Sequence, residues 1–389
     1  AGQQEPARLQ DRQAAHGPGP LSGLALRREG AVELELPESP GERGPARRRA
    51  IFYNAAMALD RDLNVSVLAG WRRVRGAPGR GWEMLSATGI RGLRLWAETD
   101  ALGELRMTEG DPSAARVLEG NARRVIRPGA QAMRADARRR PEGAPFDYVD
   151  LDPFGSPAPF ADIALAAVAD GGLVAVTATD MPVLAGAQPE ACARRYGARP
   201  LHGRSGPEGG LRILLADLAR RAAGTGREIR PLLGYVLDHH VRSYVVVGPA
   251  GPVAPPVATL DRIPDGAARN SGRPPFGPMW LGALFDPEFL KELDVPPQAA
   301  RGRELGRLLE RFREESAVAI PFFFEANEIA HQEGLARPPP LTELLAELRR
   351  NGFPAARSHV RPGAFRTAAP AASVAAAARR VLDGARRVE

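Results

Sequence analysis

Cysteine and lysine are almost missing from the sequence. Its 389 residues include one cysteine, Cys192, and one lysine, Lys291. A single cysteine excludes an intrachain disulfide and a cysteine-rich structural zinc site. The six histidines are scattered, and the adjacent pair His239 and His240 would lie on opposite faces of a strand. We therefore expect no bound metal.

Long apolar runs are also missing. No run approaches the roughly 20 residues that an apolar helix needs to span a bilayer. Residues 1–28 begin with a polar stretch, interrupted by glycine and proline, that lacks the apolar core of a signal peptide. This segment is expected to be a flexible tail, and the protein is expected to be cytoplasmic, with monomer as the favoured state.

Positive charge is in excess, with a formal net charge of +7. Such an excess suits a polyanionic partner such as a nucleic acid. Nearly all of the positive charge is arginine, which makes forked contacts to phosphate, but a GC-rich genome also replaces lysine with arginine. The sign of the charge is therefore more informative than the choice of residue.

Strand and helix patterns alternate between residues 81 and 248. Strands are expected at 82–86, at 104–108, in a short segment ending near 136, at 146–151 and at 173–177, with helices beginning near 90, 112, 157 and 211. This alternation predicts a parallel sheet with helices on both faces. Two further strands, 229–237 and 241–247, predict an antiparallel hairpin at one sheet edge. The result is an α/β fold with the Rossmann-like sheet of class I methyltransferases.

The C-terminal third has a different pattern. Residues 249–278 are rich in proline and glycine and are expected to link domains. Helices are expected at 303–315, 341–350 and 373–387, and one strand at 353–360. We therefore predict a tail over 1–28, a methyltransferase domain over 29–250 and a smaller, mainly helical α+β domain over 251–389.

Polar and glycine residues follow successive expected strands. Glu83 lies in the first expected strand, and Gly89 lies in the loop that opens the next helix. Glycine there lets a ligand approach the backbone where the strand order reverses. The loop has neither the GxGxxG pattern of dinucleotide folds nor the lysine of a P-loop. A methyltransferase is therefore favoured over a dinucleotide-binding fold.

Acidic residues end the next two strands. Asp111 is placed to bind ribose hydroxyls, and Asp136, followed by Ala137, could accept the amino group of adenine. Each aspartate taken alone fits an ordinary helix cap or turn. Together with the glycine loop, on three successive strand ends, they favour a nucleoside cofactor.

The most specific motif is Asp-Leu-Asp-Pro-Phe-Gly at 150–155, after the fourth strand and on the same sheet edge. An exocyclic amine on a base is a poor nucleophile because its lone pair is delocalised into the ring. The carboxylate of Asp152 and the carbonyl of Pro153 could hold the amine and aim its lone pair at a methyl group. Phe154 could stack on a base removed from its helix. The alternative is a strand end with a capping aspartate.

These motifs resemble those of the tRNA guanine-26 N2-dimethyltransferases of archaea and eukaryotes. The resemblance runs from about residue 29 to about residue 370. The matching segments are 52–54 with Met57, 60–62, 85–92, 150–157, 177–180, 195–198 and 277–282.

The resemblance implies roles for individual residues. Asp152 would be catalytic, and Phe52 and Phe154 would flank the target base, while S-adenosyl-L-methionine would be the methyl donor and tRNA the partner, held in part by the C-terminal domain. The residues implied to contact the cofactor are Arg61, Glu83, Asp111, Asp136 and Ala137.

The chain departs from the family pattern at three places. The cysteines that many members carry before Gly277 are missing at 267–271, the residue after Asn54 is Ala55, and a family His-Glu pair is Pro207-Glu208. Two other readings stay open. One is methylation of another RNA base, an rRNA guanine or an adenine amino group, and the other is a non-catalytic RNA-binding protein on the same fold.

Overall fold

The computed structural model describes residues 23–37, 51–125, 128–143, 145–263 and 275–385. Its centre is a seven-stranded sheet in the order β5-β4-β3-β6-β7-β9-β8. Along the chain, the strands are β3 (Gly79–Glu83), β4 (Leu102–Glu109), β5 (Ala130–Arg134), β6 (Phe146–Leu151), β7 (Val168–Ala178), β8 (Arg227–Leu237) and β9 (His240–Pro249).

The pairing of the strands confirms the predicted fold class. The pairs from β5 to β7 are parallel, whereas β9 runs antiparallel to both β7 and β8. The hairpin β8–β9 closes one edge of the sheet, as its short connection predicted. The central strands are buried on both faces, which is why most residues of β6, and of β7 from Leu173 onward, are apolar.

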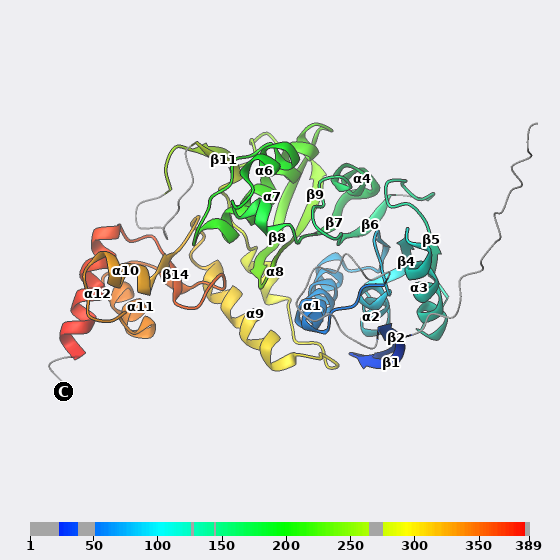
Figure 1. The fold of residues 1–389 in the computed structure, drawn as a ribbon, viewed down its shortest axis with the longest axis horizontal. Helices are drawn as coiled ribbons and strands as arrows, with labels where there is room; N and C mark the ends of the chain where they lie inside the picture. Colours follow the sequence, from blue (N-terminus) through cyan, green and yellow to red (C-terminus); the bar gives the residue numbers. More distant parts are fainter. Residues whose placement is uncertain (1–22, 38–50, 126–127, 144, 264–274, 386–389) are drawn as a thin grey trace, which may run out of the picture.

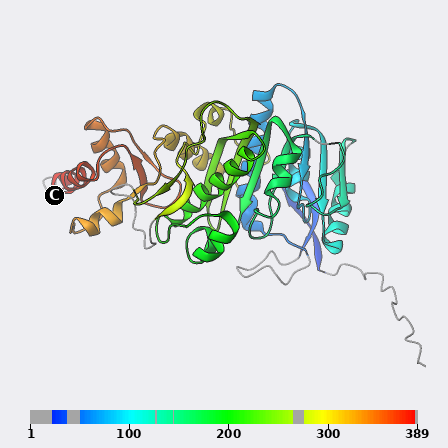
Figure 2. The same cartoon turned by 90° about the horizontal axis from the view of Figure 1, so that it is seen from above.

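Helices cover both faces of the sheet (Figures 1 and 2). One face carries α1 (Ala58–Arg75), α2 (Ile90–Glu98) and α3 (Pro112–Val125), joined by α8 (Pro287–Lys291) beside β8. The other carries α4 (Ala161–Ala167) and the long α7 (Gly206–Ala223), against which α5 (Met181–Leu184) and α6 (Pro189–Tyr196) pack.

The alternation of strand and helix fails once. None of the described residues between β5 and β6, which are 135–143 and 145, is helical. The segment contains a run of arginines and two prolines but no apolar residues at helical spacing, so it has no face to bury against the sheet. The sheet face over β4 and β5, opposite α2 and α3, therefore has no covering helix from this connection.

The expected N-terminal tail and the expected linker each contain residues of a strand. Within the expected tail 1–28, β1 (Leu24–Glu29) pairs with β2 (Val32–Pro37), because alternating apolar side chains on β2 are buried beside α2 and α3. Residues 1–22 lie outside the described residues. Within the expected linker 249–278, β10 (Val257–Leu260) pairs with β11 (Phe276–Trp280), and Phe276 and Met279 join the apolar core.

A second apolar core lies at the C-terminal end of the elongated molecule (Figure 1). There a small sheet, ordered β12-β14-β13, packs with three helices. The elements are β12 (Phe324–Glu325), α10 (Ala326–Gln332), α11 (Leu341–Arg350), β13 (Ala355–Arg357), β14 (Ala364–Thr367) and α12 (Ala371–Ala385). Before them, α9 (Gly302–Ser316) contributes to the core of the large sheet, which extends to Phe322. The predicted division near residue 250 stays a prediction.

Candidate active site

Asp152 is the centre of the candidate site. It follows β6 at the carboxyl edge of the sheet, and about a quarter of its side chain is exposed. Arg91 of α2 donates from Nη2 to Asp152 Oδ2 at 2.7 Å and, with the same nitrogen, to Asp60 Oδ2 at 2.7 Å. One guanidinium therefore links the exposed carboxylate to a fully buried one on α1.

Asp60 is held from several sides. His240 Nε2 lies 3.1 Å from its Oδ1, and the hydroxyl of Tyr235 donates to the same oxygen. Burial alone raises the pKa of this carboxyl group, but Arg91 and His240 outweigh burial and hold the pKa well below its usual range. Asp60 is therefore a fixed negative charge that orients Arg91.

Glu83 lies at the end of β3, in the interior beneath the glycine loop. Burial, and then the nearby charge of Asp150, raise the pKa of its carboxyl group to about 8. Gly92 packs closely on this carboxyl group: a Cβ atom there would lie 2.4 Å from Glu83 Oε2, so a larger residue would force the Glu83 side chain to shift. Gly89 begins α2 in the left-handed conformation, at φ +79°, which glycine adopts without strain.

Three buried polar atoms near this edge have no hydrogen-bond partner among the residues that the structure describes. They are Glu83 Oε2, Thr88 Oγ1 and Arg91 Nη1. Buried polar atoms are nearly always paired in folded proteins, so such a group of orphans is unusual. Together these atoms could pair with a ligand that carries both hydrogen-bond donors and acceptors.

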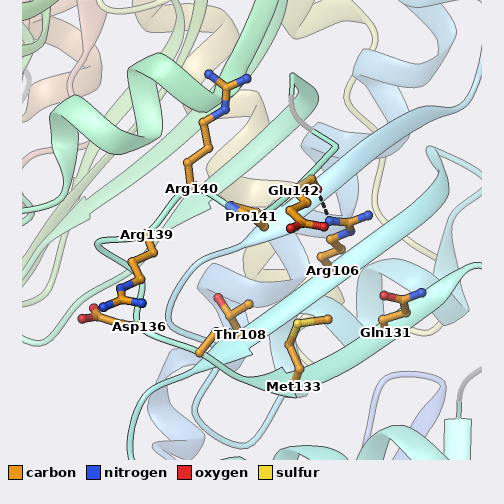
Figure 3. A pocket seen from close by; sticks show the side chains of 10 residues that line it. Arg106, Thr108, Gln131, Met133, Asp136, Arg139, Arg140, Pro141 and Glu142 are labelled. Carbon is orange, nitrogen blue, oxygen red and sulfur yellow. Dashed lines mark hydrogen bonds between the residues drawn. The ribbon is translucent and has the colours of Figure 1, made fainter.

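The two predicted nucleoside contacts lie on the next two strand ends. Asp111 Oδ1 accepts the N–H groups of Ser113 and Ala114 at 2.9 Å, so it caps α3, and its side chain is exposed. Asp136 is also exposed and accepts the N–H of Arg138 at 3.0 Å, whereas Ala137 is buried. Asp136 lies at the rim of a hollow over β4 and β5 (Figure 3).

The two phenylalanines predicted to hold the base are in contact. The ring centroids of Phe52 and Phe154 are 4.5 Å apart, and the rings meet edge to face at 89°. Phe154 is 66% exposed, although the adjacent Pro153 is buried. Thr179, after β7, fixes the loop by exchanging two hydrogen bonds with Gly155. An exposed phenylalanine on an anchored loop suits contact with a ligand.

Arg61 is placed differently from the other predicted residues. Its guanidinium forms a two-pronged ion pair with Glu29 of β1, with both N–O distances at 2.6 Å, and also donates to the carbonyl of Asn54. It is 5% exposed. These contacts hold the segment before α1, which carries Phe52, against the hairpin β1–β2. Its predicted contact with the cofactor stays a prediction.

Two residues of this site were missed in the sequence. Arg91 stands inside the glycine loop motif, and Asp60 stands two positions from Asp62 in a helix that is otherwise mostly apolar. Both are buried charges, which are rare unless paired. The signal that could have identified them is this density of charged residues in apolar surroundings.

Neither a metal-ligand cluster nor a membrane-spanning helix occurs among the described residues. The described residues contain no group of three or more histidine, cysteine, aspartate or glutamate residues placed to hold a metal ion. The segment 267–271, where the family's cysteines are missing, lies outside the described residues. No helix in the described part of the chain is long and apolar enough to cross a membrane.

Comparisons with known proteins agree with the sequence motifs. A family model for N2,N2-dimethylguanosine tRNA methyltransferases matches residues 30–253 and 270–379. A tRNA (guanine(26)-N(2))-dimethyltransferase of Pyrobaculum arsenaticum is 33% identical over 374 residues, which cover 91% of this chain and 98% of the relative. A protein of the same description from Thermococcus kodakarensis is 34% identical and covers 84% and 92%.

The fold has a solved counterpart over nearly its whole length. The structure of Trm1 from Pyrococcus horikoshii with S-adenosyl-L-methionine matches with a TM-score of 0.77 and 28% identity, and covers 91% of this chain and 99% of that chain. The predicted family resemblance is thereby confirmed, and the chain belongs to the N2,N2-dimethylguanosine tRNA methyltransferase family.

Proposed function

We propose that this protein transfers methyl groups from S-adenosylmethionine to the exocyclic N2 of guanine 26 in tRNA, and that it does so twice. The observation that carries the proposal is the placement of Asp152, a partly exposed carboxylate at the sheet edge, held by a buried arginine beside an exposed phenylalanine. The family, and the described activity of the relatives that cover most of the chain, support the base and the position.

Asp152 and Pro153 are the catalytic groups. In the first transfer, the carboxylate of Asp152 and the carbonyl of Pro153 would accept the two N2 hydrogens; in the second, the one remaining hydrogen would bond to Asp152. Both arrangements direct the nitrogen lone pair at the reacting methyl group. The cofactor supplies a sulfonium methyl group, which is already a good electrophile. Once N2 has gained a methyl group, it would carry one proton too many, and Asp152 would accept that proton and pass it to solvent. Alignment of the amine supplies much of the rate.

Phe52 and Phe154 hold the target base. At a centroid distance of 4.5 Å the rings occupy each other's contact surface, so an entering base has to displace one of them. Phe154, the more exposed ring, is the one that moves. The base then stacks on an aromatic face after leaving its own stack in the tRNA, as in other enzymes that act on extruded bases.

Arg91 and Asp60 are positioning residues. Arg91 holds Asp152 in one orientation, and Asp60, itself fixed by Tyr235 and His240, holds Arg91. Without Asp60, the guanidinium would have one buried carboxylate fewer to pair with and would no longer define a single position for Asp152.

Residues at the carboxyl ends of β3, β4 and β5 would hold S-adenosylmethionine. Asp111 would bind the ribose hydroxyls, Asp136 and the N–H of Ala137 would bind adenine, and Glu83 and Arg61 would contact the amino-acid end, with Gly89 keeping the loop open. The proposed parts of the chain are the tail 1–28, the methyltransferase domain 29–250 and a tRNA-binding domain 251–389. The proposed location is the cytoplasm, and the proposed state is a monomer.

A methylation assay with nucleoside mass spectrometry tests the function. The substrates are a tRNA transcript with guanine 26 and the same transcript with adenine 26. The expected product is N2,N2-dimethylguanosine from the first and none from the second. If N2-methylguanosine were the only product, the second methyl transfer would be wrong. A methylated product from the adenine-26 transcript would show that the position is wrong. No methylation of either RNA would show that the protein is not this methyltransferase.

A further inference from the structure

The uncovered sheet face beside the site is hollowed and edged with arginines. Thr108 of β4 and Met133 of β5 line its floor, and the loop after β5 forms its rim (Figure 3). The hollow extends from Asp136, at the carboxyl edge of the sheet, down to Arg106 and Glu142. One of its ends is therefore the strand end to which adenine is assigned.

Positive charge dominates this rim. The exposed arginines of β5 and the following loop are Arg134, Arg138, Arg139 and Arg140, against the acidic residues Asp136 and Glu142. The side chain of Arg139 makes no hydrogen bond or ion pair with any residue in the described ranges, and in Figure 3 it extends from the rim near Asp136. Arg138 is 72% exposed, and its guanidinium approaches Asp136 only to 3.8 Å.

The base of the hollow is comparatively rigid. The guanidiniums of Arg80 and Arg106 lie over the ring of Phe146, at 5.5 and 5.8 Å from its centroid. Glu104 accepts hydrogen bonds from both, at 2.8 and 3.1 Å. These two arginines are held by carboxylates and by the ring of Phe146. On the rim, Arg134 and Arg140 each donate one hydrogen bond to a backbone carbonyl, at 3.4 and 3.3 Å, and both side chains stay exposed. An edge of exposed arginines suits a polyanion better than an apolar partner.

We propose that this arginine surface, made of the exposed rim residues Arg134, Arg138, Arg139 and Arg140, binds backbone phosphates of the tRNA near the methylated guanine. The proposal rests on the proposed function, since it takes tRNA as the substrate. Guanidiniums form paired hydrogen bonds with phosphate oxygens, and the hollow adjoins the edge where the base must meet the methyl group. Phosphates held here would keep the flanking RNA beside Asp152 while the base is extruded.

The test is the double variant Arg138→Ala with Arg139→Ala, in the full chain. Neither side chain supports the fold, because the backbone N–H groups that bond to Asp136 remain. The matched control is Arg123→Ala, an exposed arginine of α3 on the opposite face of the same sheet. Filter binding of tRNA over a salt series gives the affinity and its salt slope, and calorimetry gives the affinity for S-adenosylmethionine.

The double variant is expected to bind tRNA more weakly and to lower the salt slope by about 1 for each arginine, or about 2 in all. Its KM for tRNA should rise, while its affinity for S-adenosylmethionine and its Tm stay those of the wild type. The control Arg123→Ala should change none of these quantities.

An unchanged salt slope would overturn the proposal, because the surface would then serve another partner, such as an acidic protein. Loss of cofactor affinity would overturn it too, because the hollow would then belong to the cofactor. A wild-type protein that binds tRNA without methylating it would refute the proposed function and leave this surface standing.

Discussion

Two buried ionic networks in this molecule differ in how completely their charges are paired. The first, at the site, is Asp60–Arg91–Asp152 with Glu83 beside it. The second, between the large sheet and the C-terminal core, has Glu208, Arg212, Glu315, His359 and Arg366 as its members. Both oxygens of Glu208 and both oxygens of Glu315 accept hydrogen bonds.

In the second network, the closed one, the carboxylates are fully paired, whereas the site network, the open one, has groups without a partner in the described part of the chain. It ends in a partly exposed carboxylate, and polar atoms of Glu83 and Arg91 are buried without a partner among the described residues. Burying charge is costly unless it is paired. The closed network therefore serves to join two parts of the fold, and the open one holds unpaired groups that a ligand can satisfy. Substitutions in the site network should therefore lower turnover, whereas substitutions in the closed network should lower stability.

The largest expected effect is that of Asp152→Asn, at the exposed end of the open network. The amide keeps the size of the side chain but replaces one acceptor oxygen with a donor, which would face the hydrogens of the guanine amine. Loss of such positioning or proton transfer is expected to lower kcat by about 10²–10⁴. Single-turnover methylation at saturating cofactor and tRNA measures it. The Tm and the affinity for tRNA serve as controls. If Asp152 only ended a strand, asparagine, which is also a good cap, would keep the wild-type rate.

Arg366→Met tests the closed network. Arg366 donates to Glu208 at 2.9 Å and to Glu315 at 2.6 Å, so its loss leaves two buried carboxylates short of a partner. Breaking a buried ion pair from one side costs about 3–5 kcal/mol. Urea unfolding should show this loss, while the folded fraction keeps its turnover. Arg307→Met, at an exposed position of α9, is the control and should change little. Equal stabilities of the two variants would show that the network does not hold the parts together.

The pH dependence of stability should change in the same variant. Burial alone would raise the pKa of Glu315, but His359 and Arg366 lower it by more than burial raises it. The pKa of Glu315 is therefore well below its ordinary value. A carboxyl group with a depressed pKa stabilises the fold above its unfolded pKa, and this stability is lost as the pH falls. The wild type should therefore lose stability below about pH 4.5 more steeply than Arg366→Met does.

The sequence allowed the strand ends to be predicted, but not the contacts between them. Asp152, Glu83 and Asp111 follow strands within a few residues, so local patterns identify them. The link from Arg91 to Asp60 and Asp152 joins residues 31 and 61 positions apart on three elements, and no local pattern reports it. No helix was expected between the strands ending near 136 and beginning at 146, and none of the described residues there is helical, because this polar segment has no apolar face to bury. The amphipathic pattern of α9 predicted a helix, but nothing in it identified which core the helix joins.

Asp60→Asn and Asp62→Asn form a matched pair on one helix. Asp62 is as buried as Asp60, but it pairs with Arg94 at 2.6 Å and accepts the N–H of Arg301 at the start of α9. Asp60→Asn should lower kcat, by up to about 10²-fold, with little change in KM for tRNA, because misplacement of a catalytic group has costs of that size. Asp62→Asn should lower the Tm and keep kcat. If the two variants lost kcat in proportion to their loss of stability, Asp60 would have no positioning role.

The smallest expected effect is the release of at most one proton when the cofactor binds. The pKa of Glu83, raised to about 8 by burial and by Asp150, leaves its carboxyl group mostly protonated at pH 7. S-adenosylmethionine brings a sulfonium and an ammonium group to this edge, and nearby positive charge favours the carboxylate. Binding should therefore release up to about one proton per protein at pH 7, and less at pH 9, where Glu83 is already ionised.

Calorimetry in phosphate and in Tris at one pH measures this release, because the two buffers differ in their enthalpy of ionisation. Glu83→Gln cannot lose a proton from this side chain, so its binding enthalpy should depend on the buffer much less.

The pH dependence of stability without cofactor is a second test of the raised pKa of Glu83. A carboxyl group with a raised pKa stabilises the fold below its unfolded pKa, and this stability is lost as the pH rises through about 8. The Tm of Glu83→Gln should therefore fall less than that of the wild type between pH 6 and pH 9. If the wild type and Glu83→Gln released equal numbers of protons, the released proton would not come from Glu83.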